Sequence, residues 1–367
     1  MSGGNYSPLQ TAYNPLGMVI AIAPDKFKGT LTSMQAAEAM REGVLAVCPD
    51  ADIHIVPMAD GGEGTAAIIG PEMGFKPYKA VIHPPLEGLP MNEATYYYSS
   101  EEKAVLFDSA TAIGLSLVPP DKRDIMRASS APVGELLGIV QERHEVDHAF
   151  IGLGGTATCD GGLGMVLYMA KYSVRMPQIV GLYDAAVPLV APIGMPSALT
   201  FAAQKGADAD DTAMLEIRLR KAMKMMPDGD ADTPGAGAAG GLGFVILAMG
   251  GKLAPGVEVV VGRRISGLHP DIVITGEGRI DSQSLMGKVL SYFISYHRET
   301  GTPVIAVGGC ISPDSGITTD AGTSSRGDLT AMIAADAYEP RDVDPVTTEV
   351  AAWRIREAIA DRLPALL

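Results

Sequence analysis

Short apolar segments of strand length alternate with longer segments of helical period along most of this chain. This alternation is typical of an α/β fold, in which helices cover a largely parallel sheet. The first part is the clearest, because strands are predicted at 19–24 and 53–59 and a helix near 33–47 between them. These three segments predict one βαβ unit.

The middle of the chain has a different pattern. Residues 94–100 and 103–110 predict an antiparallel pair of strands, and a helix near 131–143 and a strand at 148–153 follow. The remaining elements that we expect are helices at 161–171, 210–226 and 236–250, strands at 271–278, 303–309 and 329–335, and a final helix at 346–362. Because 367 residues exceed what one core usually organises, we expect two domains, with the last part completing the first sheet.

Charge and cysteine usage narrow the classes of function. A formal net charge of −15 disfavours nucleic acid and anionic membranes as partners, so an anionic substrate must meet local cations or a metal. Cys48, Cys159 and Cys310 lie far apart, which predicts free thiols rather than a disulfide framework or a zinc ribbon. No apolar run is long enough to span a bilayer and no Lys or Arg precedes Lys26, so we expect a cytoplasmic protein.

Four loops at predicted strand ends are rich in glycine and charge: 24–33, 58–65, 152–162 and 275–284. Ligands of open α/β sheets bind at the carboxyl ends of the strands, so together these loops predict a phosphate-handling site. Glycine lets backbone N–H groups approach an anion closely. One such loop alone is more often a tight turn or a close packing contact, and only the combination of four favours a site.

The loop 152–162, GLGGTATCDGG, supplies the main phosphate candidates. We expect Gly154, Gly155, Thr156 and Thr158 to contact phosphate oxygens. Asp160 is expected to face either Mg²⁺ or the attacking hydroxyl.

Charged side chains in the other loops complete the candidate site. Lys26 and Lys28 flank Phe27 and project to one side of an extended segment, where both could reach one anion, although solvated lysines before a helix capped by Thr32 or Ser33 are an equal alternative. The further candidates are the acids Asp60, Glu63, Glu277 and Asp281 with Arg279, and the weaker phosphate candidates Lys205 and Lys288. The acids could bind Mg²⁺ or form a surface salt-bridge network.

Three motifs have a structural or a different functional interpretation. HEVDH at 144–148 matches a zinc pattern, but the predicted helix stops near Val146, so the two histidines would not share a helical face. GAGAAG at 235–240 lacks a preceding strand, and we expect a helix packed closely against a neighbour. GLGGTA at 152–157 does follow a strand and Asp184 ends a later one, so a nicotinamide dinucleotide site stays an alternative.

The loops in this order resemble one family, the bacterial glycerate kinases. The resemblance covers nearly the whole chain after residue 17 and is carried by APDKFKGTLTSMQAAEAM, PMADGGEGT, GLGGTATCDGG, FAAQKGA, PGAGAAGGLG and DIVITGEGRIDSQSLMGK. It implies phosphorylation of D-glycerate to 2-phosphoglycerate with ATP and Mg²⁺. It also implies a flavodoxin- or Rossmann-like parallel-sheet domain from 18–80 and 270–367 and an inserted mixed α/β domain at 81–269. Residues 1–17 are polar and rich in turn-forming residues, so we expect a flexible extension there.

Within that resemblance we assign roles to the candidates. Lys26, Lys28 and Arg279 would bind anions, Asp160 and Asp184 would hold Mg²⁺, and Asp60 or Asp281 would accept the hydroxyl proton. We expect a small-molecule hydroxy acid as the substrate, and the sequence leaves open a homodimer and which hydroxyl is phosphorylated.

This sequence departs from the family at several positions. The family usually has Ser and Asn where Thr156 and Cys159 stand, and Thr and Asn where Ala186 and Val187 stand. FAAQKGA lacks the family proline, and the stretch between Gly162 and Asp184 is shorter than usual. A catalytically silent relative that binds a nucleotide or a carboxylate is therefore a second hypothesis.

Overall fold

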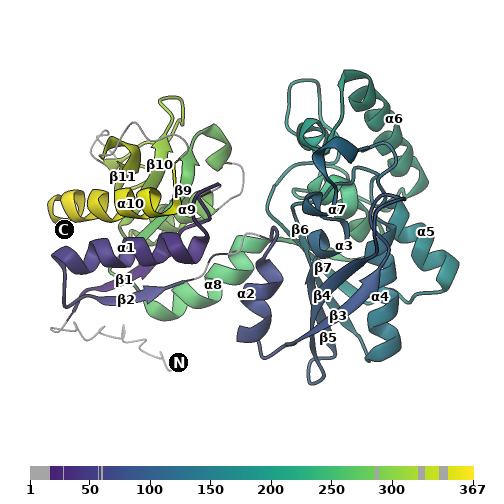
Figure 1. Ribbon diagram of the computed structural model, residues 1–367, viewed down its shortest axis with the longest axis horizontal. Helices are drawn as coiled ribbons and strands as arrows, with labels where there is room; N and C mark the ends of the chain where they lie inside the picture. Colours follow the sequence, from purple (N-terminus) through teal and green to yellow (C-terminus); the bar gives the residue numbers. More distant parts are fainter. Residues whose placement is uncertain are drawn as a thin grey trace, which may run out of the picture.

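The computed structural model describes residues 17–27, 29–56, 58, 61–285, 289–320, 327–338 and 346–367. All but the last residue of the predicted extension at 1–17 lies outside these ranges. Two β-sheets form the centres of two halves of the molecule, which lie side by side in Figure 1. Helices pack against both sheets, so the predicted α/β class is confirmed.

The first sheet has five strands, all parallel, in the order β11-β10-β9-β1-β2. Its strands come from both ends of the chain: β1 (Val19–Ile22), β2 (Asp52–Ile55), β9 (Ile272–Ile280), β10 (Val304–Ile311) and β11 (Ala331–Ala334). The prediction that the last part of the chain completes the first sheet is therefore confirmed.

Apolar residues on both faces of β1 explain why this sheet is covered on both sides. Ile20 and Ile22 belong to an apolar cluster with α1 (Ser33–Val47) and α10 (Thr348–Arg362). Ala21, together with Ala23 just after the strand, belongs to a second cluster with α8 (Gly256–Leu268) and α9 (Val289–Thr300). The helix α1 begins after Thr32, whose side chain accepts a hydrogen bond from the Gln35 N–H in a capping box, as the predicted helix at 33–47 requires.

The second sheet has six strands in the order β3-β4-β5-β6-β7-β8. The strands are β3 (Lys76–Ile82), β4 (Asn92–Ser99), β5 (Ala104–Asp108), β6 (His148–Leu153), β7 (Gln178–Tyr183) and β8 (Lys252–Pro255). Pairing is antiparallel from β3 to β5 and parallel from β5 to β8. The predicted antiparallel pair is thus confirmed, while β3 and β8 extend the sheet beyond the prediction.

Helices from the middle of the chain build the largest apolar cluster on one face of the second sheet. They are α3 (Ser109–Ile113), α4 (Ala131–Arg143), α5 (Leu163–Tyr172), α6 (Ala209–Met225) and α7 (Ala238–Ala248). The helices α2 (Thr65–Glu72) and α8 lie between the two sheets in Figure 1. One apolar cluster therefore joins Leu182 of the second sheet, Val261 of α8 and Val273 of the first sheet.

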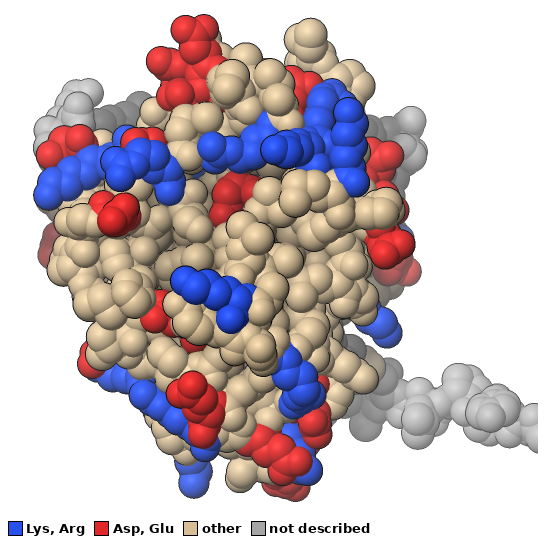
Figure 2. Space-filling view, turned by 90° about the vertical axis from the view of Figure 1, so that its right-hand side faces the viewer, with Lys and Arg blue, Asp and Glu red and all other residues tan. Residues whose placement is uncertain are grey.

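The chain crosses between the two sheets twice, once between β2 and β3 and once between β8 and β9. Figure 2 shows the outer face of the second half, where Lys and Arg side chains lie in a row with acidic side chains above the row and near its ends. In the described part of the chain, none of the helices has the length and apolar composition needed to cross a membrane.

Candidate active site

A cavity of about 800 Å³ lies between the two halves, at the carboxyl ends of strands from both sheets. Each of the four glycine-rich loops predicted from the sequence contributes to its lining, through Asp25 and Lys26, Gly62 and Glu63, Gly154 to Thr156, and Glu277 to Arg279 with Asp281.

The second half supplies the rest of this lining, mainly from the segment after β7, from the two short 3₁₀ helices before α6 and from the start of α7. These residues are Leu115, Leu153, Asp184, Ala185, Val187, Pro196, Thr200, Phe201, Ala203, Gln204, Lys205, Ala238, Ala239 and Gly240. The cavity is therefore a shared one, with walls from segments far apart in the chain.

Close backbone contacts explain why glycine is needed where three loops meet. A Cβ atom on Gly154 would lie 2.6 Å from Asp184 Oδ2 and 2.6 Å from the Cα of Gly62, which leaves no room for any other side chain. Gly155 has a φ of +68°, and a Cβ there would lie 3.3 Å from the Cβ of Glu63. The glycines of the loop 152–162 therefore allow the three loops to pack closely and leave backbone N–H groups unshielded by side chains at the cavity.

Asp108 positions one of these loops, and no motif in the sequence singles it out. Its carboxylate accepts hydrogen bonds from the N–H of Gly64 (2.9 Å) and of Ala66 (3.0 Å), at the start of α2. The side chain is buried at the carboxyl end of β5. An acid near the end of a predicted strand was the signal that could have identified it.

Asp160 is not among the residues that line the cavity, and this placement does not fit its predicted role. One oxygen, Oδ2, accepts hydrogen bonds from the N–H and the hydroxyl of Ser130 and from the N–H of Gly164, and Oδ1 accepts one from the N–H of Gly162. The carboxylate is buried and joins the starts of α4 and α5. Thr158, predicted to contact phosphate, is also fully buried and outside the cavity lining.

Lys205 is a buried cation that does line the cavity, as its predicted binding role requires. It ends the 3₁₀ helix Ala203–Lys205, and its Nζ donates to the carbonyl oxygen of Thr158 (2.7 Å) and to Thr156 Oγ1 (3.3 Å). Burial lowers the pKa of Lys205, and the neighbouring Cys159, Asp184 and Asp160 act in the opposite direction.

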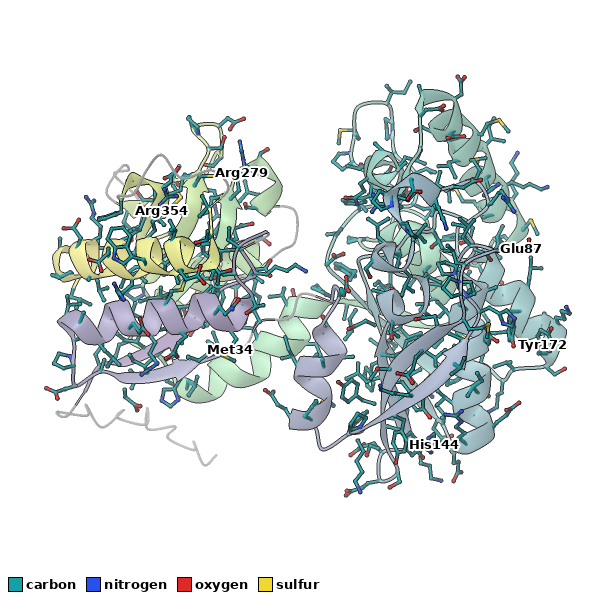
Figure 3. The ribbon with its side chains drawn as sticks, in the orientation of Figure 1. Met34, Glu87, His144, Tyr172, Arg279 and Arg354 are labelled. Atoms are coloured by element: carbon teal, nitrogen blue, oxygen red, sulfur yellow. The ribbon has the colours of Figure 1, made fainter. Side chains whose placement is uncertain are left out.

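The first half supplies the other two cations of the described lining, Lys26 and Arg279, and both are exposed. Arg279 Nε lies 3.4 Å from Asp281 Oδ2, and Figure 3 shows Arg279 on the part of its half that faces the second half. The strand β9 continues to Ile280, so Glu277 and Arg279 lie within the strand rather than after it. The predicted residues Lys28, Asp60 and Lys288 lie outside the described residues.

The charges of the lining suit a ligand that combines anions with a hard cation. Five carboxylates, from Asp25, Glu63, Asp184, Glu277 and Asp281, accompany three cations among the described lining residues. Within the described ranges, no group of three or more His, Cys, Asp or Glu side chains could hold a metal ion. Mg²⁺ is often bound by one or two carboxylates together with the phosphates of a substrate, and this donor set fits that mode.

The histidines of HEVDH do not share a helical face. The helix α4 ends at Arg143, His144 caps it and His148 begins β6. The His144 ring stacks on Tyr98 with centroids 4.1 Å apart, and burial lowers the pKa of His144. In Figure 3 this histidine lies at the far end of the second half from Arg279, so the motif is structural.

The segment GAGAAG at 235–240 packs closely against the loop 152–162, as expected, but it does not form the regular helix that the sequence predicts there. Ala239, Gly240 and Gly241 have φ values of 52°, 67° and 95°, and a Cβ on Gly240 would lie 2.0 Å from the carbonyl oxygen of Thr158. The N–H of Gly161 donates to the carbonyl of Gly240 (3.0 Å). The two glycine-rich segments therefore form one wall of the cavity.

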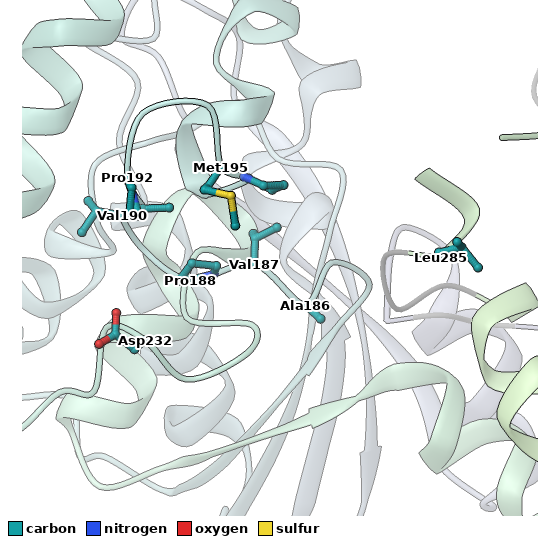
Figure 4. Close-up of a pocket in the computed structure, with 10 residues that line it drawn as sticks. Ala186, Val187, Pro188, Val190, Pro192, Met195, Asp232 and Leu285 are labelled. Carbon is teal, nitrogen blue, oxygen red and sulfur yellow. The ribbon is translucent and has the colours of Figure 1, made fainter. Parts of the chain in front are cut away.

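An apolar cavity of about 440 Å³ adjoins the charged one and is shown in Figure 4. It is lined by Ala186, Val187, Pro188, Val190, Ala191, Pro192, Met195, Pro196, Asp232 and, from the first half, Leu285. Val187 and Pro196 line both cavities. A ligand with a charged part and an apolar part could therefore occupy both.

Comparisons with known proteins agree on one family. The model of the glycerate kinase family matches residues 20–170 and 167–335. A glycerate kinase of Bacillus subtilis (strain 168) is 34% identical over 335 residues, which cover 81% of this chain and 86% of that protein. The glycerate 2-kinase of Escherichia coli (strain K12) is 34% identical over 338 residues, which cover 82% and 87%. A crystal structure assigned to glycerate kinase 2 from Salmonella typhimurium LT2 has a TM-score of 0.68 and 27% identity, covering 95% of this chain and 98% of that chain.

Proposed function

Because this chain belongs to the glycerate kinase family, we propose that it transfers the γ-phosphoryl group of ATP to a hydroxyl of D-glycerate and forms 2-phosphoglycerate. The observation that carries this proposal is the single cavity in which glycine-rich backbone, carboxylates and cations from both sheets meet. Phosphoryl transfer depends mainly on positioning and on charge neutralisation, and this lining can supply both.

We assign the phosphate groups to the backbone of Gly154, Gly155 and Thr156 and to the exposed cations Lys26 and Arg279. Asp184 lies against Gly154 and is the carboxylate best placed to hold Mg²⁺, with Glu63 near the same loop. When bound, Mg²⁺ would neutralise phosphate charge. Asp160 is not part of this assignment, because its oxygens hold the starts of two helices.

Asp281 is our candidate for the group that accepts the hydroxyl proton. Its carboxylate lines the cavity, and Oδ2 lies 3.4 Å from Nε of Arg279. This ion pair holds the carboxylate near the end of β9. A positioned base typically contributes about a hundredfold or more to the rate. Asp60, the alternative base, lies outside the described residues.

The apolar cavity is our candidate for the nucleobase. Its volume of about 440 Å³ and the two lining residues that it shares with the charged cavity suit a flat base attached to a triphosphate. Ala186 and Val187, where the resembled family usually has polar residues, both line this apolar cavity. Their loss of polarity is therefore compatible with base binding.

The test is turnover with ATP, Mg²⁺ and D-glycerate, with the product identified by ³¹P NMR. We expect 2-phosphoglycerate, and 3-phosphoglycerate would overturn the assigned position. Binding of ATP without ADP formation over a panel of hydroxy acids would support the catalytically silent relative instead.

Family membership disfavours the alternative of a nicotinamide dinucleotide site, which predicts NADH binding without competition from ATP. A cytoplasmic location, a homodimer and the lack of a nucleic-acid partner stay predictions from the sequence.

A further inference from the structure

Lys205 is the cation that the second half contributes to the described lining, and it is the one that is buried. We propose that the Lys205 ammonium binds the carboxylate of the acceptor acid and so selects acids over neutral alcohols. This inference rests on the proposed kinase function and names the subsite that recognises the acceptor.

The first argument is that Lys205 Nζ has only neutral hydrogen-bond partners among the described residues. Its two hydrogen bonds go to neutral oxygens, the carbonyl of Thr158 and the hydroxyl of Thr156. No ion pair of Lys205 is found among the described residues, so its charge is offset there only by more distant groups. Because an ammonium has three donors and a buried charge is costly without a counter-ion, a ligand anion would stabilise this site.

The second argument is the kind of anion. The triphosphate carries several charges, and the exposed cations Lys26 and Arg279 of the first half are available to it. A single buried ammonium matches a carboxylate of one negative charge. Thr200 and Gln204, close to Lys205 in the chain, also line the cavity and can donate hydrogen bonds to the acid.

The third argument is the position of Lys205 relative to the phosphate loop. Thr156 contacts Lys205 Nζ and belongs to the segment assigned to phosphate. An acid held at Lys205 would therefore present its hydroxyl close to the transferred group. This arrangement suits a short hydroxy acid better than a long one.

The experiment compares Lys205→Met with the parent enzyme and with Lys224→Met, an exposed lysine in α6. In Lys205→Met we expect the KM for D-glycerate to rise by about thirtyfold or more and the KM for ATP to change by less than about threefold, in keeping with loss of a charged hydrogen bond. Lys205→Arg should recover part of the loss. A rise in the KM for ATP with an unchanged KM for glycerate would overturn the proposal.

Two measurements on the parent enzyme test the proposal even if the Lys205 variants do not fold. The parent enzyme should use glyceramide, the uncharged analogue, at least about tenfold less efficiently than glycerate, and equal use would overturn the proposal. Calorimetric titration with glycerate alone separates the two proposals. If the parent binds glycerate through Lys205 but forms no phosphoglycerate, the kinase proposal fails and the carboxylate site stands.

Discussion

At the scale of single residues, the same type of side chain performs quite different tasks in this molecule. The Asp160 carboxylate accepts four hydrogen bonds and fixes the starts of α4 and α5. Asp184, which follows the neighbouring strand, lines the cavity instead. Asp160 lies in the glycine-rich loop after β6 and Asp184 directly follows β7, so a position after a strand alone did not separate a helix cap from a ligand-binding group.

We expect Asp160→Asn to lower the free energy of unfolding by about 2 kcal/mol, because the amide nitrogen would face N–H donors. Urea unfolding measures this loss, with the exposed Asp121→Asn as the control. The kcat of the folded variant should stay within a few fold of the parent. A loss of kcat on the order of a hundredfold at unchanged stability would restore Asp160 to the catalytic machinery.

Asp281→Asn should have the opposite profile. We expect kcat to fall on the order of a hundredfold, because the amide cannot accept the hydroxyl proton, while stability changes little. Steady-state kinetics and urea unfolding measure the two effects. The exposed Asp210→Asn in α6 is the matched control. Full activity of Asp281→Asn would leave the base to be sought elsewhere.

At the scale of elements, the segment after β7 forms much of the apolar cavity wall. Met195 is 63% exposed there, so its replacement should not disturb the fold. We expect Met195→Asp to raise the KM for ATP about tenfold, on the order of 1.4 kcal/mol, because the base would meet a charge. The KM for glycerate should stay the same, and Met214→Asp, at an exposed position of α6, is the control. An unchanged KM for ATP would place the base elsewhere.

Asp328 links the connection between β10 and β11 to α9. Burial alone would raise the pKa of Asp328, but hydrogen bonds from the N–H and hydroxyl of Thr318 and the contact with Arg298 outweigh it and lower the pKa. The stability that the Asp328 carboxylate contributes is therefore complete when the pH is above its pKa in the unfolded chain. It is lost as the pH falls through its lower pKa in the folded protein.

We expect urea unfolding of the parent to show this loss of stability below about pH 4, and Asp328→Asn to flatten the dependence over the same range. The variant should also be less stable than the parent at neutral pH, because it loses a charged partner of Arg298. Asp228→Asn, at an exposed position, serves as the control for acid sensitivity in general. Parallel pH profiles for Asp328→Asn and the parent would contradict this interpretation.

Which elements could be predicted follows from their length and burial. The buried strand β1 and the capped helix α1 carried clear patterns. The strand β8 has four residues and ends in proline, and α2 contains both glycine and proline, so neither gave a usable pattern. In contrast, α9 buries Leu290, Phe293, Ile294 and His297 at helical spacing and could have been found.

At the scale of the whole molecule, the sequence predicted that four loops would meet but not how they meet. That depends on long-range packing, such as the contact of Gly154 with Gly62 and Asp184 and the apolar cluster shared by both sheets. No local pattern encodes these contacts, because the residues are far apart in the chain. The boundaries of the two domains likewise stay a prediction.

The cavity takes its walls from both halves, so a ligand that fills it must contact both. Hydrogen exchange with a non-hydrolysable ATP analogue, Mg²⁺ and D-glycerate should therefore protect backbone amides in the loop 153–157 of the second half and at 277–281 of the first. At about a hundredfold excess over Kd the complex gains about 2.7 kcal/mol of stability, enough to slow exchange in both segments. The amides of α5, which lie outside the lining, report the protection that overall stabilisation alone provides, and protection in the two walls should exceed it. Protection of one wall alone would mean that the ligand is held by a single half, and the shared site would have to be abandoned.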